Sequence, residues 1–177
     1  MPSGIAFFCR QMSDALLPED VIELARRVVV ENSALGRTVA LAESCTGGLV
    51  AAALTEIPGS SAVLDRSFVT YSNEAKREML GVSRDIIDTF GAVSIACAWA
   101  MAQGALQRSG ADVSVAISGI AGPDGGTDLK PVGTVVFARA VREGDEDPEG
   151  DMRQFDGASR SEVRHQATLA ALELLLP

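Results

Sequence analysis

RTVALAESCTGGLVAAALTEIPG, residues 37–59, is the stretch that decides the fold. Its apolar run over residues 37–43 predicts a buried β-strand, and the small residues of SCTGG follow without a spacer. The alanine-rich run behind them predicts a helix over residues 46–57 that stops at Pro58 and Gly59. A strand that passes through a tight turn straight into a helix is typical of α/β proteins.

Helices and strands alternate through the rest of the chain. Further helices are predicted at residues 18–32, 74–81, 83–91, 94–110 and 159–175, with Asn73 as the N-terminal cap of the second, and further strands at residues 63–72, 111–119, 134–141 and 151–157. This pattern predicts an α/β fold, a three-layer α/β/α sandwich whose mixed sheet of about five strands is mostly parallel and ends in an antiparallel element. We expect a loose N-terminal segment over residues 1–16 and a single domain over residues 17–177.

Composition excludes several classes of protein. The net charge of -9 repels nucleic acid, so no nucleic-acid partner is expected. Cys9, Cys45 and Cys97 lie far apart without the spacing of a metal site, which predicts a reduced, cytoplasmic protein without a structural metal. No apolar stretch approaches the roughly 18 residues of a membrane span, so no membrane partner is expected. The acidic run over residues 143–151 is typical of a solvated loop.

Three predicted strands end in polar, glycine-rich segments. These are ESCTGG at residues 43–48, TYSNEAK at residues 70–76 and SGIAGPDGG at residues 118–126. In open α/β sheets, ligands bind outside the carboxyl ends of the strands. We therefore expect the three segments to form one site.

Ser44 lies at the junction of the first strand and its helix. There its hydroxyl would lie beside the free N–H groups of the helix's first turn, which can hold a phosphate or a developing oxyanion. The alternative is that Ser44 or Thr46 only caps the helix and that the glycines only permit close packing. Cys45 competes as a nucleophile, because a helix N-terminus lowers the pKa of a thiol. Strand alternation, however, directs Cys45 away from the side that Ser44 faces.

A serine nucleophile needs a base, and the only histidine, His165, lies in the terminal helix. Lys76 is the better candidate, because burial and the positive end of its helix both favour the neutral amine. Its pKa would have to fall from about 10.4 by roughly three units, which burial can achieve and exposure cannot. The alternative is an ordinary surface lysine. Tyr71, five residues earlier, could relay a proton or hold the substrate.

The loop GIAGPDGG, residues 119–126, offers backbone N–H groups that could hold a phosphate or a ribose. Lys130, Arg139 and Arg164 could supply a phosphate clamp, although each alone is typical of a surface charge.

Together, AESCTGG, FVTYSNEAK, GAVS, SGIAGPDGG and KPVGTV give the chain a resemblance to the CinA C-terminal family over about residues 20–175. The resemblance implies hydrolysis of the carboxamide of nicotinamide mononucleotide to the nicotinate nucleotide and ammonia, in pyridine-nucleotide salvage, without a metal or an organic cofactor. It also implies that Ser44 is the nucleophile and Lys76 its base, with Tyr71 nearby. The substrate-binding residues expected on this basis are Glu43, Cys45, Thr46, Gly47, Gly48, Asn73, Gly122, Pro123, Asp124, Gly125, Gly126 and Arg164.

The sequence departs from the family pattern near its end. Where the family reads GDRxxVRxxA, this chain reads FDGASRSEVRHQA, with one extra residue, so that Arg164 is favoured over Arg160 as a site residue. The pyrophosphatase-like domain of the longer family members is not in this chain, so that activity is not expected. A catalytically silent nucleotide-binding or regulatory module is the alternative function, and an interaction domain fits the polar strand ends less well. The alanine-rich helix and the acidic loop permit a homodimer.

Overall fold

The computed structural model describes residues 15–143 and 149–177, which hold six α-helices and five strands. The helices are α1 (Glu19–Leu35), α2 (Leu49–Thr55), α3 (Asn73–Leu80), α4 (Arg84–Phe90), α5 (Ile95–Gln107) and α6 (Arg160–Leu174), with a short 3-10 helix, η1 (Ser60–Ala62). The strands are β1 (Val39–Glu43), β2 (Leu64–Val69), β3 (Val113–Gly119), β4 (Thr134–Val141) and β5 (Glu149–Gln154). None of the helices in these residues is long and apolar enough to span a membrane.

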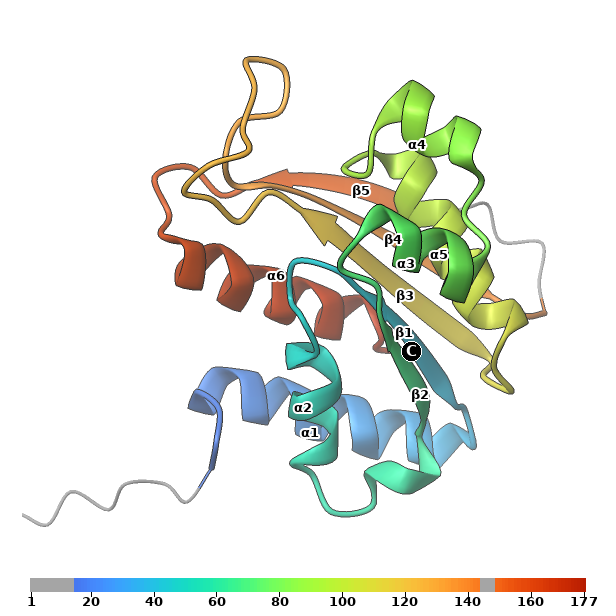
Figure 1. Ribbon diagram of the computed structural model, residues 1–177. Coiled ribbons are helices and arrows are strands. Elements are labelled where there is room, and N and C mark those ends of the chain that lie inside the picture. The colour runs from blue at the N-terminus through green and yellow to red at the C-terminus, as the bar shows by residue number, and fades with distance from the viewer. Residues whose placement is uncertain (1–14, 144–148) are drawn as a thin grey trace, which may run out of the picture.

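The strands form one sheet in the order β2-β1-β3-β4-β5 (Figure 1). β1 is parallel to both of its neighbours, whereas β4 is antiparallel to β3 and to β5. Four strands therefore run in one direction, and β4 alone runs the other way. Helices α1, α2 and α6 cover one face of the sheet and α3, α4 and α5 cover the other. The predicted three-layer α/β/α sandwich with a mostly parallel, mixed sheet is confirmed.

Alternation along the central strands supplies both layers of the core. Successive side chains of a strand point to opposite faces, so Leu41 and Ile117 pack with α1, α2 and α6. Ala42 and Ala116, their neighbours in sequence, pack with α5 on the other side. Burial on both faces explains why β1 and most of β3 read as continuous apolar runs. The alanines on the α5 side allow that helix to lie close to the sheet.

Two local predictions near the strand ends were wrong. The helix after β1 begins at Leu49 and not at residue 46, because Gly47 and Gly48 have φ of 62° and 99° and cannot belong to a right-handed helix. Helix α3 is capped by Ser72 and not by Asn73, since the Ser72 hydroxyl accepts the N–H of Ala75 at 3.0 Å.

Strand β5 begins two residues before its predicted start and ends at Gln154, three residues earlier than predicted. The N-terminal segment predicted to be loose lies largely outside the described residues, as does the centre of the acidic run.

Helices α3 and α5 meet at Gly104. A Cβ atom built at Gly104 would overlap the carbonyl oxygen of Leu80, the last residue of α3. The missing side chain therefore lets α5 approach the end of the helix that carries Lys76.

We predict that Gly104→Ala lowers the free energy of unfolding by about 1–3 kcal/mol, because the methyl group must displace backbone of α3. At an open helical position the same change would stabilise by about 1 kcal/mol, so the sign is diagnostic. Urea unfolding measures the effect, with Gln107→Ala on the exposed side of α5 as the control, expected within about 0.5 kcal/mol of wild type. A Gly104→Ala protein as stable as wild type would contradict the close approach.

Candidate active site

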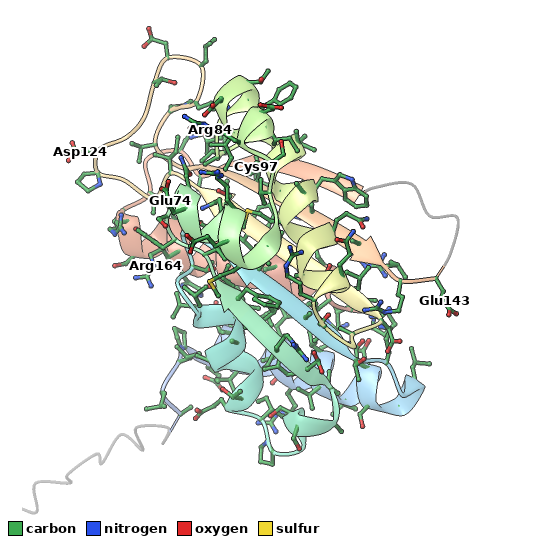
Figure 2. All side chains as sticks on the ribbon, turned by 45° about the vertical axis from the view of Figure 1, so that its right-hand side comes forward. Glu74, Arg84, Cys97, Asp124, Glu143 and Arg164 are labelled. Atoms are coloured by element: carbon green, nitrogen blue, oxygen red, sulfur yellow. The ribbon has the colours of Figure 1, made fainter. Side chains whose placement is uncertain are left out.

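The site lies where the strand order reverses. The chain leaves β1 through α2 on one face and leaves β2 through α3, α4 and α5 on the other, so β2 and β3 flank β1 on opposite sides. Ligands bind at such a switch point, at the carboxyl ends of the strands. The Ser44 N–H donates to the Ile117 carbonyl at 3.0 Å and joins the end of β1 to β3. Figure 2 shows Glu74, Asp124 and Arg164 toward one edge of the molecule, with Glu143 at the opposite edge.

A cleft of about 280 Å³ lies at this edge and is lined by parts of all three strand-end segments. Its volume is near the lower end of the roughly 300–1,000 Å³ of small-molecule sites, which favours a ligand of about nucleotide size. The expected residues that line it are Ser44, Cys45, Tyr71, Asn73, Lys76, Gly122, Asp124 and Gly125. The three segments therefore do meet in one site.

Lys76 is buried at the base of this cleft, with 1% of its surface exposed. Its amine nitrogen lies 3.1 Å from the Ser44 hydroxyl oxygen, 2.8 Å from the Thr70 carbonyl oxygen and 3.5 Å from that of Tyr71. Within the described residues, no carboxylate forms an ion pair with it. Burial lowers the pKa of Lys76 below its ordinary value of 10.5, against a smaller effect of Cys97 and Cys45 in the other direction.

The surroundings of the amine direct its lone pair. A neutral amine has two hydrogens, which the carbonyl oxygens of Thr70 and Tyr71 can accept, the second at the longer distance. The lone pair is then left for the Ser44 hydroxyl, which becomes the donor of that hydrogen bond. The geometry thus suits proton transfer from Ser44 to Lys76.

The ends of β1 and β2 bring these two side chains together. The Thr70 N–H donates to the Glu43 carbonyl at 2.8 Å, which fixes the chain between β2 and α3 beside the end of β1. Ser72 then starts α3, and Lys76 lies one turn into that helix, with its N–H bonded to the Ser72 carbonyl. Its side chain therefore reaches back to the strand ends.

Cys45 is a poor nucleophile in this position. It is 4% exposed, and burial raises the pKa of its thiol to about 11. Only about one thiol in 10⁴ is ionised at pH 7 with such a pKa. The helix N-terminus was expected to lower this pKa, but here burial outweighs the nearby N–H groups.

Glu43 does not line the cleft; it is fully buried and bonded to the chain itself. Its carboxylate accepts five hydrogen bonds, from the hydroxyls of Thr46 and Ser67 and the N–H groups of Gly48, Val50 and Ala51. The first turn of α2 is therefore occupied, which corrects the expectation that its N–H groups are free for an oxyanion. Thr46, Gly47 and Gly48 also lie outside the cleft lining, in the turn that Glu43 holds.

The two arginines of α6 exchange the roles expected from the sequence. Arg160 lines the cleft, where it donates to the Tyr71 hydroxyl at 3.0 Å and to the Gly122 carbonyl at 2.6 Å. Arg164, one turn later, lies outside the cleft lining and donates to the carbonyls of Cys45 and Thr46 at 3.1 and 3.2 Å. The helix begins at Arg160, which brings that residue and not Arg164 to the cleft.

The glycine-rich loop lines the cleft with all of residues 119–126 except two. Pro123 and Gly126 are exposed and do not line it. Lys130 does not reach the cleft either, because its amine donates to the Phe90 carbonyl at the end of α4, at 2.7 Å. Arg139, on β4, is also absent from the cleft lining.

Sequence reasoning missed several lining residues. Ser118 lines the cleft and donates to the Ala92 carbonyl at 2.8 Å, and Ala92 and Val93 supply an apolar wall. Ser118 begins the segment 118–126 that the sequence places at the site, but no role was assigned to it. Ala92 and Val93 belong to the GAVS segment but carry no chemical signal of their own.

We predict that Glu43→Gln lowers the free energy of unfolding by about 1–3 kcal/mol, because an amide group presents two hydrogens to donors that are then left unsatisfied. Glu31→Gln is the matched control, since Glu31 forms an exposed pair with Arg27 and should change stability by less than about 0.5 kcal/mol. Urea unfolding at neutral pH distinguishes the two. Equal stability of the two variants would contradict the role given to Glu43.

The CinA C-terminal domain matches residues 21–177 of this chain. The nicotinamide-nucleotide amidohydrolase PncC of Escherichia coli (strain K12) is 51% identical over 158 residues, which cover 88% of this chain and 93% of that protein. The protein of the same name from Enterobacter agglomerans is 48% identical over 165 residues, 93% of this chain and 96% of that protein.

Other relatives are longer than this chain. The CinA-like protein of Syntrophotalea carbinolica is 54% identical over 140 residues, 79% of this chain, but the chain spans only 33% of that protein.

The crystal structure of the competence/damage inducible protein CihA from Agrobacterium tumefaciens has a TM-score of 0.87 at 51% identity, covering 91% of this chain and 96% of that one. The residues matched by the domain include every residue that lines the cleft. The chain belongs to the CinA C-terminal domain family.

Proposed function

We propose that this chain is an amidohydrolase that converts nicotinamide mononucleotide to nicotinate mononucleotide and ammonia, in pyridine-nucleotide salvage, with Ser44 as the nucleophile and Lys76 as its base. The observation that carries the proposal is the buried Lys76 amine, 3.1 Å from the Ser44 hydroxyl in a nucleotide-sized cleft. The likeness to the Escherichia coli protein named nicotinamide-nucleotide amidohydrolase, over 88% of this chain, supports the choice of substrate.

The reaction begins when neutral Lys76 takes the proton of Ser44 and the resulting alkoxide attacks the amide carbon. The tetrahedral intermediate collapses, the C–N bond breaks, and protonated Lys76 gives its proton to the departing ammonia. Water then attacks the acyl-enzyme and loses a proton to Lys76, which returns it to the Ser44 oxygen as the ester bond breaks. The carboxylate product and the free hydroxyl are thereby formed.

The charges of the cleft suggest how the substrate is oriented. Arg160 is held by Tyr71 and Gly122 at the cleft and can bind the phosphate. Ala92 and Val93 offer an apolar surface to the pyridine ring. The carboxamide then lies toward Ser44 and Lys76. A cytoplasmic location, a homodimeric state and the lack of a nucleic-acid partner remain predictions from the sequence.

We predict that Ser44→Ala reduces ammonia release from nicotinamide mononucleotide by about 10³-fold or more, and that Lys76→Ala reduces it by about 10²–10⁴-fold. Ser61→Ala, an exposed serine of η1, should leave turnover unchanged. Near-wild-type turnover in either site variant would remove that residue from the mechanism. Binding of the mononucleotide by wild-type protein without product over hours would instead support the silent module.

The rate should rise with pH, because only the neutral form of Lys76 accepts the Ser44 proton. Burial lowers the pKa of Lys76, so the ascending limb of kcat/KM should lie below the ordinary value of 10.5. Initial rates of ammonia release between about pH 5 and pH 10 measure this profile. A rate that falls over that range as the amine loses its proton would contradict the assignment of Lys76 as base.

A further inference from the structure

We propose that the peptide N–H groups of Cys45 and Thr46 form the oxyanion hole of this site, and that Arg164 is the residue that positions the Thr46 N–H. The inference rests on the proposed function and deepens it, because it names the groups that stabilise the tetrahedral intermediate formed on Ser44.

Hydrogen bonding within the chain eliminates the neighbouring donors. The N–H groups of Gly48, Val50 and Ala51 donate to Glu43. The N–H groups of Gly47 and Leu49 are also used. Gly47 donates to the Ser44 carbonyl at 3.0 Å, and Leu49 donates to the Thr46 carbonyl at 3.3 Å. Between Ser44 and residue 51 of the described chain, the N–H groups of Cys45 and Thr46 are the ones that donate to no oxygen of the protein.

Arg164 fixes the direction of the Thr46 N–H. A trans peptide is planar, and its C=O and N–H groups point in opposite directions. The Cys45 carbonyl accepts a hydrogen bond from Arg164 at 3.1 Å, so the N–H of the same peptide, which belongs to Thr46, points away from Arg164. Arg164 lines a separate cavity of about 330 Å³ between α1 and α6, whereas Cys45 lines the cleft. The Thr46 N–H therefore points away from that cavity, into the turn whose residue Cys45 lines the cleft, while Thr46 itself is fully buried.

The charge of Arg164 also strengthens the Thr46 N–H as a donor. A hydrogen bond from a guanidinium to a carbonyl polarises the peptide and makes its N–H a better donor. Within the described residues no carboxylate pairs with Arg164, so its positive charge is left to act on the Cys45 and Thr46 carbonyls. The N–H groups of Cys45 and Thr46 also lower the pKa of the Cys45 thiol, an effect that burial outweighs.

Arg164 thus differs from Arg160 in what its removal should change. Arg160 lines the cleft and is available to the substrate in its ground state, whereas Arg164 acts through the peptide that receives charge in the transition state. Loss of one oxyanion donor typically reduces kcat by about 10²–10³-fold, and loss of the residue that orients it should cost less.

The test compares Arg164→Gln, Arg164→Lys and Arg160→Gln in ammonia release from nicotinamide mononucleotide. We expect Arg164→Gln to reduce kcat by about 10–100-fold with KM within about two-fold of wild type. Arg164→Lys should recover part of kcat, since an ammonium can still bond one carbonyl. Arg160→Gln should raise KM instead. An Arg164→Gln protein with a raised KM and unchanged kcat, or with neither changed, would overturn the inference.

A second measurement separates this inference from the proposed substrate. A fluorophosphonate probe reacts with an activated serine and places its phosphoryl oxygen in the oxyanion hole, whatever the natural substrate is. We expect Ser44 labelling in wild type, slower by about 10–100-fold in Arg164→Gln. If Arg164→Gln slows labelling as expected but wild type releases no ammonia from nicotinamide mononucleotide, the proposed substrate is contradicted. The proposed oxyanion hole would still stand. Equal labelling rates in wild type and in both Arg164 variants would contradict the oxyanion hole alone, and no labelling of wild type would contradict both.

Discussion

The buried amine of Lys76 is the constraint on which the site depends. An ammonium ion in this position would lose most of its hydration without gaining a carboxylate partner among residues 15–143 and 149–177, so burial favours the neutral form. The carbonyl oxygens of Thr70 and Tyr71 accept its hydrogens and leave Ser44 as the third neighbour. A buried lysine destabilises the folded protein when its amine is charged. The same burial makes the amine useful as a base, which is an example of activity gained at the expense of stability.

Several features of the fold serve to keep that amine in place. The parallel pairing of β1 and β2 brings Ser44 and Thr70 to the same edge of the sheet. Glu43 binds the start of α2 and reaches across to Ser67 on β2, so that the turn carrying Ser44 is fixed to both strands. Gly104 lets α5 close against the end of α3. Together these contacts fix the strand ends and the helix that carry the hydroxyl and the amine.

The sequence predicted the layers, the strand ends and the residues that the cleft brings together, because these follow from local patterns. Ser44 and Lys76 each follow a recognisable strand, and parallel strands place their ends at one edge. Features that depend on distant partners were not predictable. The carboxylate of Glu43 is occupied by donors on α2 and β2, and the thiol of Cys45 is controlled by burial. The roles of Arg160 and Arg164 depend on the residue at which α6 begins. The extra residue in the segment before α6 made that start hard to predict from the sequence.

Titration of Lys76 itself tests most directly whether burial favours its neutral amine. The chain has two lysines, Lys76 and Lys130, so protein labelled with ¹³C at the lysine ε-carbon and carrying Lys130→Arg gives a single lysine signal in an NMR pH titration. We expect a midpoint below 10.5, since burial lowers the pKa of Lys76. A midpoint at 10.5 or above, as for a lysine in water, would contradict it.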